Sequence, residues 1–370
     1  ELAIEAFEIA AQLDPDNHTR HEQLADLYLE AGEARRGDAI AQLQQLLTFA
    51  PDRVEVYKAL SNLYKDENEL DKAWCLAQAL VFLGAASPEE KALYAKYRPA
   101  QFIPATRRLT EELWGKAIIH PAEDRLVGAI FATTLGALAG STAQPPTAFG
   151  LDAGARVDLD HDNRLPARVT KYAAGVLALD PAPMLWFDAG DGLRVANTVD
   201  KGKLAPSLLC GKGARSDERE LAFEIGKHMA YLRPERYVTY ALASTAKIES
   251  AFAAALLAAG GPAPADASDD ARKLAGAVKK TVPSSMLEQV AVLAGKLGPR
   301  LGNGLVTHWR SATDLTANRV GLILANDLET AAKMVATETS TTSPRATFRK
   351  RAQRQNGRLA PRKPKVCGTH

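Results

Sequence analysis

Cysteine and long apolar runs are both scarce in this sequence, and each absence argues against a class of protein. The 370 residues contain 3 cysteines, Cys75, Cys210 and Cys367, which lie far apart. Their odd number and wide spacing argue against a disulfide framework and against any C-x-x-C zinc or redox motif. No run of about 18 uncharged apolar residues occurs, so we expect no membrane-spanning helix. A reducing, cytoplasmic location is the default expectation.

Positive charge is scarce in the body of the chain and concentrated at its end. The sequence holds 46 Lys+Arg and 44 Asp+Glu, and Glu338 is its last acidic residue. The basic residues that follow are Arg345, Arg349, Lys350, Arg351, Arg354, Arg358, Arg362, Lys363 and Lys365. Without them the body carries 37 basic and 44 acidic residues, a net charge of −7, which is not the field of a nucleic-acid-binding domain. We therefore predict a disordered basic tail over 339–370 and expect nucleic acid as a partner only through that tail.

An internal repeat organises the first ninety or so residues. Small residues recur where two helices would approach closely, and Tyr or Leu recurs where successive helix pairs would pack. The positions with these shared offsets are Ala3, Phe7, Ala10, Pro15, Leu24, Ala25, Tyr28, Gly32, Ala39, Leu43, Leu46, Pro51, Tyr57, Leu60, Ser61, Tyr64, Ala73, Ala77 and Leu80. Two full units and one half are present, with extra residues in the turn around 33–38. Residues 1–86 therefore resemble tetratricopeptide repeat proteins.

This resemblance implies a fold and a partner. It implies an α-solenoid over 1–99, and the half repeat at its start implies further repeats before it in a longer protein. In that family the first helix of each unit lines a groove that binds a protein or peptide segment. The matching groove positions here are Glu22, Asp26, Glu55, Lys58, Asn62 and Lys65. Lys58 and Asn62 resemble one step of a carboxylate clamp, but its companions from adjacent repeats are missing.

The rest of the body predicts a second, mixed domain. Residues 100–164 are interpreted as a helical connector and 165–338 as an α+β domain. Apolar bursts bounded by turn residues predict strands at 184–187, 193–198 and 206–210, and helices are expected on both sides of them. The fold class is thus mainly α, with a repeat solenoid followed by an α+β domain with a small sheet.

The helix expected over 220–231 carries the second resemblance. Glu220, Leu221, Ile225 and Gly226 match the framework of the helix E-L-x-x-V-x-G-H-E-x-x-H. That helix belongs to the CAAX-prenyl-protease-like zinc metallopeptidases, a gluzincin family in which a small sheet precedes it. The resemblance covers about 165–335 and implies a zincin-like fold. An unrelated helical domain is the alternative, because the matching pattern is short.

The catalytic positions of that family are changed here. Two imidazoles one turn apart would bind zinc, and a glutamate between them would act as general base. Lys227 and Tyr231 stand at the imidazole positions and His228 at the base position. Downstream, Asp314 stands at the third ligand position and Asn318 at the supporting one. These residues are vestigial site positions, so we predict no catalytic residue, no metal and no cofactor, and an ion pair between Lys227 and Asp314 in place of the metal.

The predicted function is a non-catalytic protein–protein interaction scaffold. One alternative is a zinc metallopeptidase with atypical ligands, for which His228 and Asp314 are the candidates. The other is an adaptor that binds nucleic acid or an anionic membrane through the basic tail. Tight stoichiometric zinc would identify the first, and binding that falls steeply with salt would identify the second.

Overall fold

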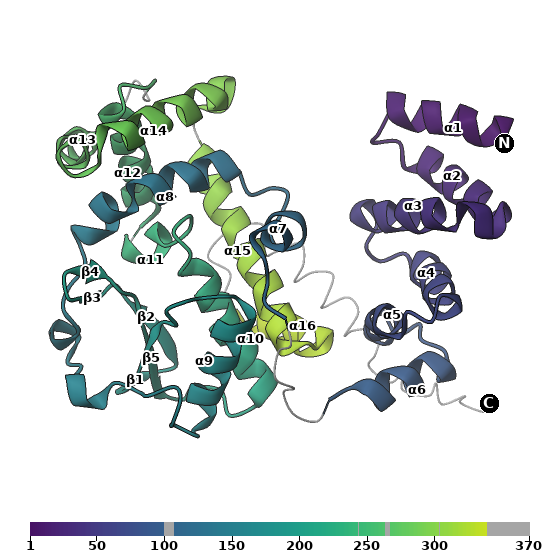
Figure 1. Ribbon diagram of the computed structural model, residues 1–370, viewed down its shortest axis with the longest axis horizontal. Coiled ribbons are helices and arrows are strands. Elements are labelled where there is room, and N and C mark those ends of the chain that lie inside the picture. The colour runs from purple at the N-terminus through teal and green to yellow at the C-terminus, as the bar shows by residue number, and fades with distance from the viewer. Residues whose placement is uncertain (100–106, 243, 263–266, 303, 339–370) are drawn as a thin grey trace, which may run out of the picture. The chain divides into compact units, whose positions relative to one another are not determined.

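The computed structural model describes residues 1–99, 107–242, 244–262, 267–302 and 304–338. The predicted basic tail, 339–370, lies outside the described residues. The chain divides into two compact units, and the boundary falls between Phe102 and Ile103. Both units are mainly helical, and the second also holds a small mixed sheet (Figure 1). Among the described residues, no helix combines the length and the apolar composition that crossing a bilayer requires.

The first unit is a succession of helices, each packed on the next along the chain (purple to blue in Figure 1). The helices are α1 (Leu2–Leu13), α2 (His18–Glu30), α3 (Arg36–Phe49), α4 (Val54–Asp66), α5 (Leu70–Phe82) and α6 (Pro88–Tyr97). The longer turn expected around 33–38 contains a 3₁₀ segment, Gly32–Arg35. Ser87 begins α6 with a capping box, since its hydroxyl accepts from the amide of Glu90 and the Glu90 carboxylate accepts from the amide of Ser87.

Both small and large side chains are buried in the interior of this unit. Ala73 and Ala77 are fully buried on α5, where a larger side chain would hold the helices apart. Leu60 of α4 is buried in the same cluster as Ala25 of α2 and Leu43 of α3. Hydrophobic residues from consecutive helices therefore form two buried clusters along this unit, and the partly buried Leu63 packs against both.

The second unit is larger and joins distant parts of the chain. Its helices are α7 (Glu111–Leu113), which runs into a π-helical turn (Trp114–Ile118), α8 (Arg125–Gly140), α9 (Leu165–Val176), α10 (Glu218–Tyr231), α11 (Val238–Ala241), α12 (Thr245–Ala258), α13 (Asp269–Thr281), α14 (Ser284–Leu297), α15 (Leu305–Ala325) and α16 (Leu328–Thr337). Short 3₁₀ turns occupy Pro146–Phe149, Ala153–Ala155 and Gly298–Arg300. Its core is built from α8, α11 to α14 and the start of α15.

The expected connector, 100–164, is not a separate element in its described part. The α8 side chains Ile130 and Phe131 are fully buried in the core of the second unit. The Phe131 ring centroid lies 4.9 Å from that of Trp309 on α15 and 5.6 Å from that of Phe252 on α12. An apolar helix of this kind is stable only when other helices cover it, so α8 is part of the domain.

The predicted strands are confirmed, with small shifts at their ends. The strands are β1 (Met184–Asp191), β2 (Leu193–Ala196), β3 (Val199–Asp200), β4 (Lys203–Leu204) and β5 (Ser207–Lys212). The sheet has the order β1-β5-β2, in which β1 is parallel and β2 antiparallel to β5, and β3 pairs with β4 separately. A register shift interrupts β1 between Phe187 and Asp191. An isolated bridge from Arg156 to Trp186 lies beside β1.

Candidate functional site

The candidate site is built on α10, which begins at a strong cap. The Asp217 side chain accepts hydrogen bonds from the amides of Arg219 and Glu220, and acidic residues occupy the first turn. Leu221 and Ile225 on this helix are fully buried, as the predicted amphipathic pattern requires. One face of α10 is therefore fixed in the interior of the second unit, and the residues beside it are held in place.

Two glycines let α10 and α15 pack very closely. A Cβ atom on Gly226 would lie 2.5 Å from Cδ1 of Leu324, and one on Gly321 would lie 2.9 Å from the backbone oxygen of Phe223. A side chain at Gly321 would force the two backbones apart, whereas one at Gly226 would require the end of the Leu324 side chain to move. This close crossing carries the polar residues of α10 to those of α15.

Lys227 and Asp314 meet across this crossing, which confirms the predicted ion pair. The Lys227 ammonium nitrogen lies 3.2 Å from Oδ1 of Asp314 and 2.6 Å from Oε1 of Glu338. The three side chains are 11%, 13% and 24% exposed, respectively. A buried ammonium group is stable only with such partners. Lys227 is thus held between two carboxylates.

Tyr231 completes the inner side of this cluster. Its hydroxyl donates a hydrogen bond of 3.0 Å to Oδ1 of Asp314. Burial, followed by the nearby Asp314 carboxylate, raises the pKa of the Tyr231 phenol well above its ordinary value. The phenol therefore stays protonated and acts as a donor, which makes it a poor metal ligand.

His228 is held away from this ion pair. Its Nδ1 lies 2.8 Å from the backbone oxygen of Glu224, and its ring stacks on Tyr240 with the centroids 5.8 Å apart. Burial lowers the pKa of His228, so the ring is neutral near pH 7. The predicted vestigial positions therefore divide: Lys227, Tyr231 and Asp314 come together, whereas the contacts of His228 run to other residues.

Asn318 lies one turn after Asp314 on α15 and does not join the cluster in the described structure. Its Oδ1 is buried and has no hydrogen-bond partner among the described residues. The described structure therefore shows no hydrogen bond of the Asn318 oxygen that would serve the supporting role implied by the resemblance. An amide at this position is a buried acceptor, which is a stability cost rather than a contribution.

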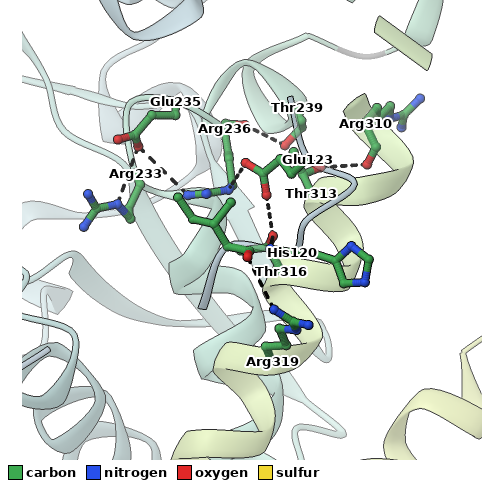
Figure 2. A network of polar contacts seen from close by, with 11 residues as sticks. His120, Glu123, Arg233, Glu235, Arg236, Thr239, Arg310, Thr313, Thr316 and Arg319 are labelled. Atoms are coloured by element: carbon green, nitrogen blue, oxygen red, sulfur yellow. Dashed lines mark hydrogen bonds and ion pairs between the residues drawn. The ribbon is translucent and has the colours of Figure 1, made fainter. Parts of the chain in front are cut away.

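A second polar network fixes the adjoining turns of α15 (Figure 2). Glu123 and Arg236 are 3% and 1% exposed, and Nε of Arg236 lies 2.8 Å from Oε1 of Glu123. Figure 2 shows Thr316 on the other side of Glu123, and its hydroxyl donates to that carboxylate. The same hydroxyl oxygen accepts a 2.9 Å hydrogen bond from the amide of His120. These bonds hold α15, and therefore Asp314, in a fixed position.

A pocket with a volume of about 340 Å³ opens beside Lys227. Its polar lining consists of Arg215, Glu224, Lys227, His228, Thr337 and Glu338. Sequence analysis missed Glu224 and Glu338 as site residues. Glu224 could have been identified from the sequence, because Glu224 and His228 are four residues apart on one helix and so share a face. No motif points to Glu338, which directly follows α16 and lies 111 residues after Lys227.

The predicted groove residues of the first unit lie on α2 and α4. Asp26, Glu55, Lys58 and Asn62 are exposed, whereas Glu22 and Lys65 are half-buried. Glu22 forms an ion pair with Arg53 at the start of α4. Lys65 lies 3.6 Å from Glu89 on α6. The exposed four form what we call the α2–α4 face.

No group of three or more His, Cys, Asp or Glu side chains within the described ranges is placed to hold a metal ion. Comparison of the chain with protein-family models, curated proteins and solved structures finds no match. A function for this protein is therefore inferred from its residues and their geometry.

Proposed function

We propose that the protein is a non-catalytic protein–protein interaction scaffold. In this proposal the first unit is a tetratricopeptide-like solenoid that binds a protein segment, and the second is a zincin-like domain that has lost its metal chemistry. The observation that carries the proposal is the α2–α4 face, where Asp26, Glu55, Lys58 and Asn62 are exposed on helices whose other sides are buried.

The chemistry of this face suits an extended polypeptide. Lys58 and Asn62 lie one turn apart on α4, so an ammonium group and an amide point from the same side of that helix. Together they offer donors to a carboxylate or a backbone carbonyl, and Asp26 on α2 offers an acceptor for an amide. The ion pair from Glu22 to Arg53 ties the start of α4 to α2, which keeps the spacing of the face fixed.

The non-catalytic part of the proposal is supported by the second unit. A zinc peptidase needs ligands that are free to bind the metal and an open position for water. Lys227 is cationic and bound to Asp314 and Glu338, and Tyr231 is a donor to Asp314. These contacts use the side chains at the former ligand positions to stabilise the fold.

Site-specific photocrosslinking of the full chain tests this proposal. A benzophenone side chain at Asn62 is expected to capture one defined polypeptide in extracts of the organism that makes the protein. Lys58→Glu, placed beside it, should abolish that capture, because it reverses the charge of the main cation on the face. The matched control is Lys91→Glu on α6, which is the same change at another exposed lysine. Equal capture by the parent, Lys58→Glu and Lys91→Glu proteins would contradict the proposal.

A further inference from the structure

The pocket beside Lys227 contains one carboxylate that the protein does not pair. Among the described residues, the Glu224 side chain makes no hydrogen bond and no ion pair, although it lines the pocket and is half-buried. Burial raises the pKa of Glu224, and the nearby Glu338 and Glu220 carboxylates raise it further, while Arg215 opposes them. The protein therefore holds an acidic group in an unfavourable environment at the pocket.

The cations around this pocket are already bound to other acids. Lys227 is bound to Asp314 and Glu338, and Arg215 lies 3.6 Å from Glu220, which also pairs with Lys333. The acids Glu220, Glu224, Asp314 and Glu338 thus face the bases Arg215, Lys227 and Lys333. These four carboxylates and three cations carry a net charge of −1. Glu224 is the carboxylate that has no ion-pair partner among the described residues.

His228 adds a second acceptor to the same wall. A backbone carbonyl can only accept a hydrogen bond. Nδ1 of His228 therefore carries a proton and donates it in a hydrogen bond to the backbone oxygen of Glu224. In the neutral ring, Nε2 is then an acceptor, and it has no hydrogen-bond partner in the described part of the chain. His228 follows Glu224 by one helical turn, so both acceptors lie on one side of α10.

We propose that this pocket binds an organic cation with several N–H donors, a guanidinium or a primary ammonium group. Glu224 supplies the opposing charge, and Nε2 of His228 and the Glu338 carboxylate accept further N–H bonds. A volume of about 340 Å³ suits one such group, because it lies at the small end of ligand pockets. The cation is an Arg or Lys side chain of a polypeptide or a small free amine.

A metal ion fits these residues less well than an organic cation. No described group of three acidic, imidazole or thiol side chains has metal-binding geometry. The Lys227 ammonium group, which lies 2.6 Å from Oε1 of Glu338, would repel a divalent ion about twice as strongly as a monovalent organic cation at the same distance. This inference concerns the second unit and is independent of binding at the α2–α4 face.

Calorimetric titration of the full chain with N-acetyl-L-arginine amide tests the inference. We expect binding with a dissociation constant in the millimolar range or below, and none with N-acetyl-L-citrulline amide, which has the same shape without the charge. Glu224→Gln should weaken binding about tenfold or more, since one charged hydrogen-bond partner is lost. Glu288→Gln on α14, the same change at an exposed site in this unit, should leave the affinity unchanged.

Methylguanidinium, as a further titrant, identifies the source of the cation. Equal affinity for methylguanidinium supports a small free cation, and tighter binding of the arginine amide supports a polypeptide side chain. Glu224→Gln removes no contact within the described structure, so it should fold, which a thermal melt verifies. Equal binding of the citrulline amide, an unchanged affinity in Glu224→Gln, or Glu224-dependent uptake of Zn²⁺ without guanidinium binding would overturn the inference.

Discussion

The two units of this protein are stabilised over very different distances along the chain. In the first unit, side-chain bonds between helices join residues such as Tyr28 and Glu8, 20 positions apart, or Arg53 and Glu22, 31 apart. In the second, Lys227 and Glu338 are 111 positions apart, and Thr316 and Glu123 are 193 apart. Local contacts make a unit whose parts depend on their neighbours, whereas long-range contacts make one whose parts depend on the whole.

The largest expected effect lies in the long-range network of the second unit. Arg236→Met removes the cationic partner of the buried Glu123 carboxylate and leaves it the hydrogen bond from Thr316, and we expect a loss of about 3–5 kcal/mol of unfolding free energy. Chemical denaturation checks this. The double variant Arg236→Met/Glu123→Gln should recover most of the loss, because the unpaired charge is gone and Thr316 keeps an acceptor. A single variant as stable as the parent would show that the pair contributes little.

The corresponding change in the first unit should stay local. Leu60→Ala removes a buried α4 side chain from a cluster that also includes residues of α2, α3 and α5, and a cost of about 2–4 kcal/mol is expected. Hydrogen exchange should show faster exchange in α3, α4 and α5 and unchanged exchange in α10. Arg236→Met provides the opposite pattern as a control. Loss of protection in both units from either variant would remove the distinction between them.

The close helix crossing predicts a smaller effect. Gly321→Ala places a methyl group against the backbone oxygen of Phe223, and a net cost of about 1–3 kcal/mol is expected from the forced separation of α10 and α15. Gly136→Ala is the control, because nothing lies within 4 Å of a Cβ at that position of α8. It should be neutral or stabilising by up to about 1 kcal/mol through helix propensity. If thermal melts showed Gly136→Ala to be less stable than Gly321→Ala, the close packing of α10 against α15 would be contradicted.

The smallest effect concerns Glu224 and has a defined pH dependence. Its pKa is raised in the folded protein, so the native state binds this proton more tightly than the unfolded chain. The contribution to stability is present below the unfolded pKa of about 4.3 and is lost as pH rises through the folded value. Glu224→Gln should therefore stabilise the protein near pH 7 by less than about 1 kcal/mol, since the site is partly solvated. Melts from pH 4 to 7 measure it, and a difference that grew toward low pH would have the wrong sign.

The sequence predicted those structural features that depend on residues close together in the chain. The strand bursts at 184–187, 193–198 and 206–210 and the helix around Gly226 follow from patterns within a few residues. The ion pair of Lys227 with Asp314 was also predictable, because the resemblance placed both residues at one site. The role of Glu338 was not, since nothing near it in the sequence shows that the end of α16 returns to α10. Glu123 and Arg236 were missed for the same reason.

The outer edge of β1 has a consequence for the behaviour of the protein at high concentration. Unpaired strand edges are templates for pairing with other copies. Here the amide of Val157 donates to the Leu185 oxygen, and the bridge of Arg156 with Trp186 lies alongside. The register shift after Phe187 then breaks the regular ladder. The first half of this edge is thus partly covered and the strand is irregular further on, which disfavours pairing of β1 with β1 of another copy of the chain.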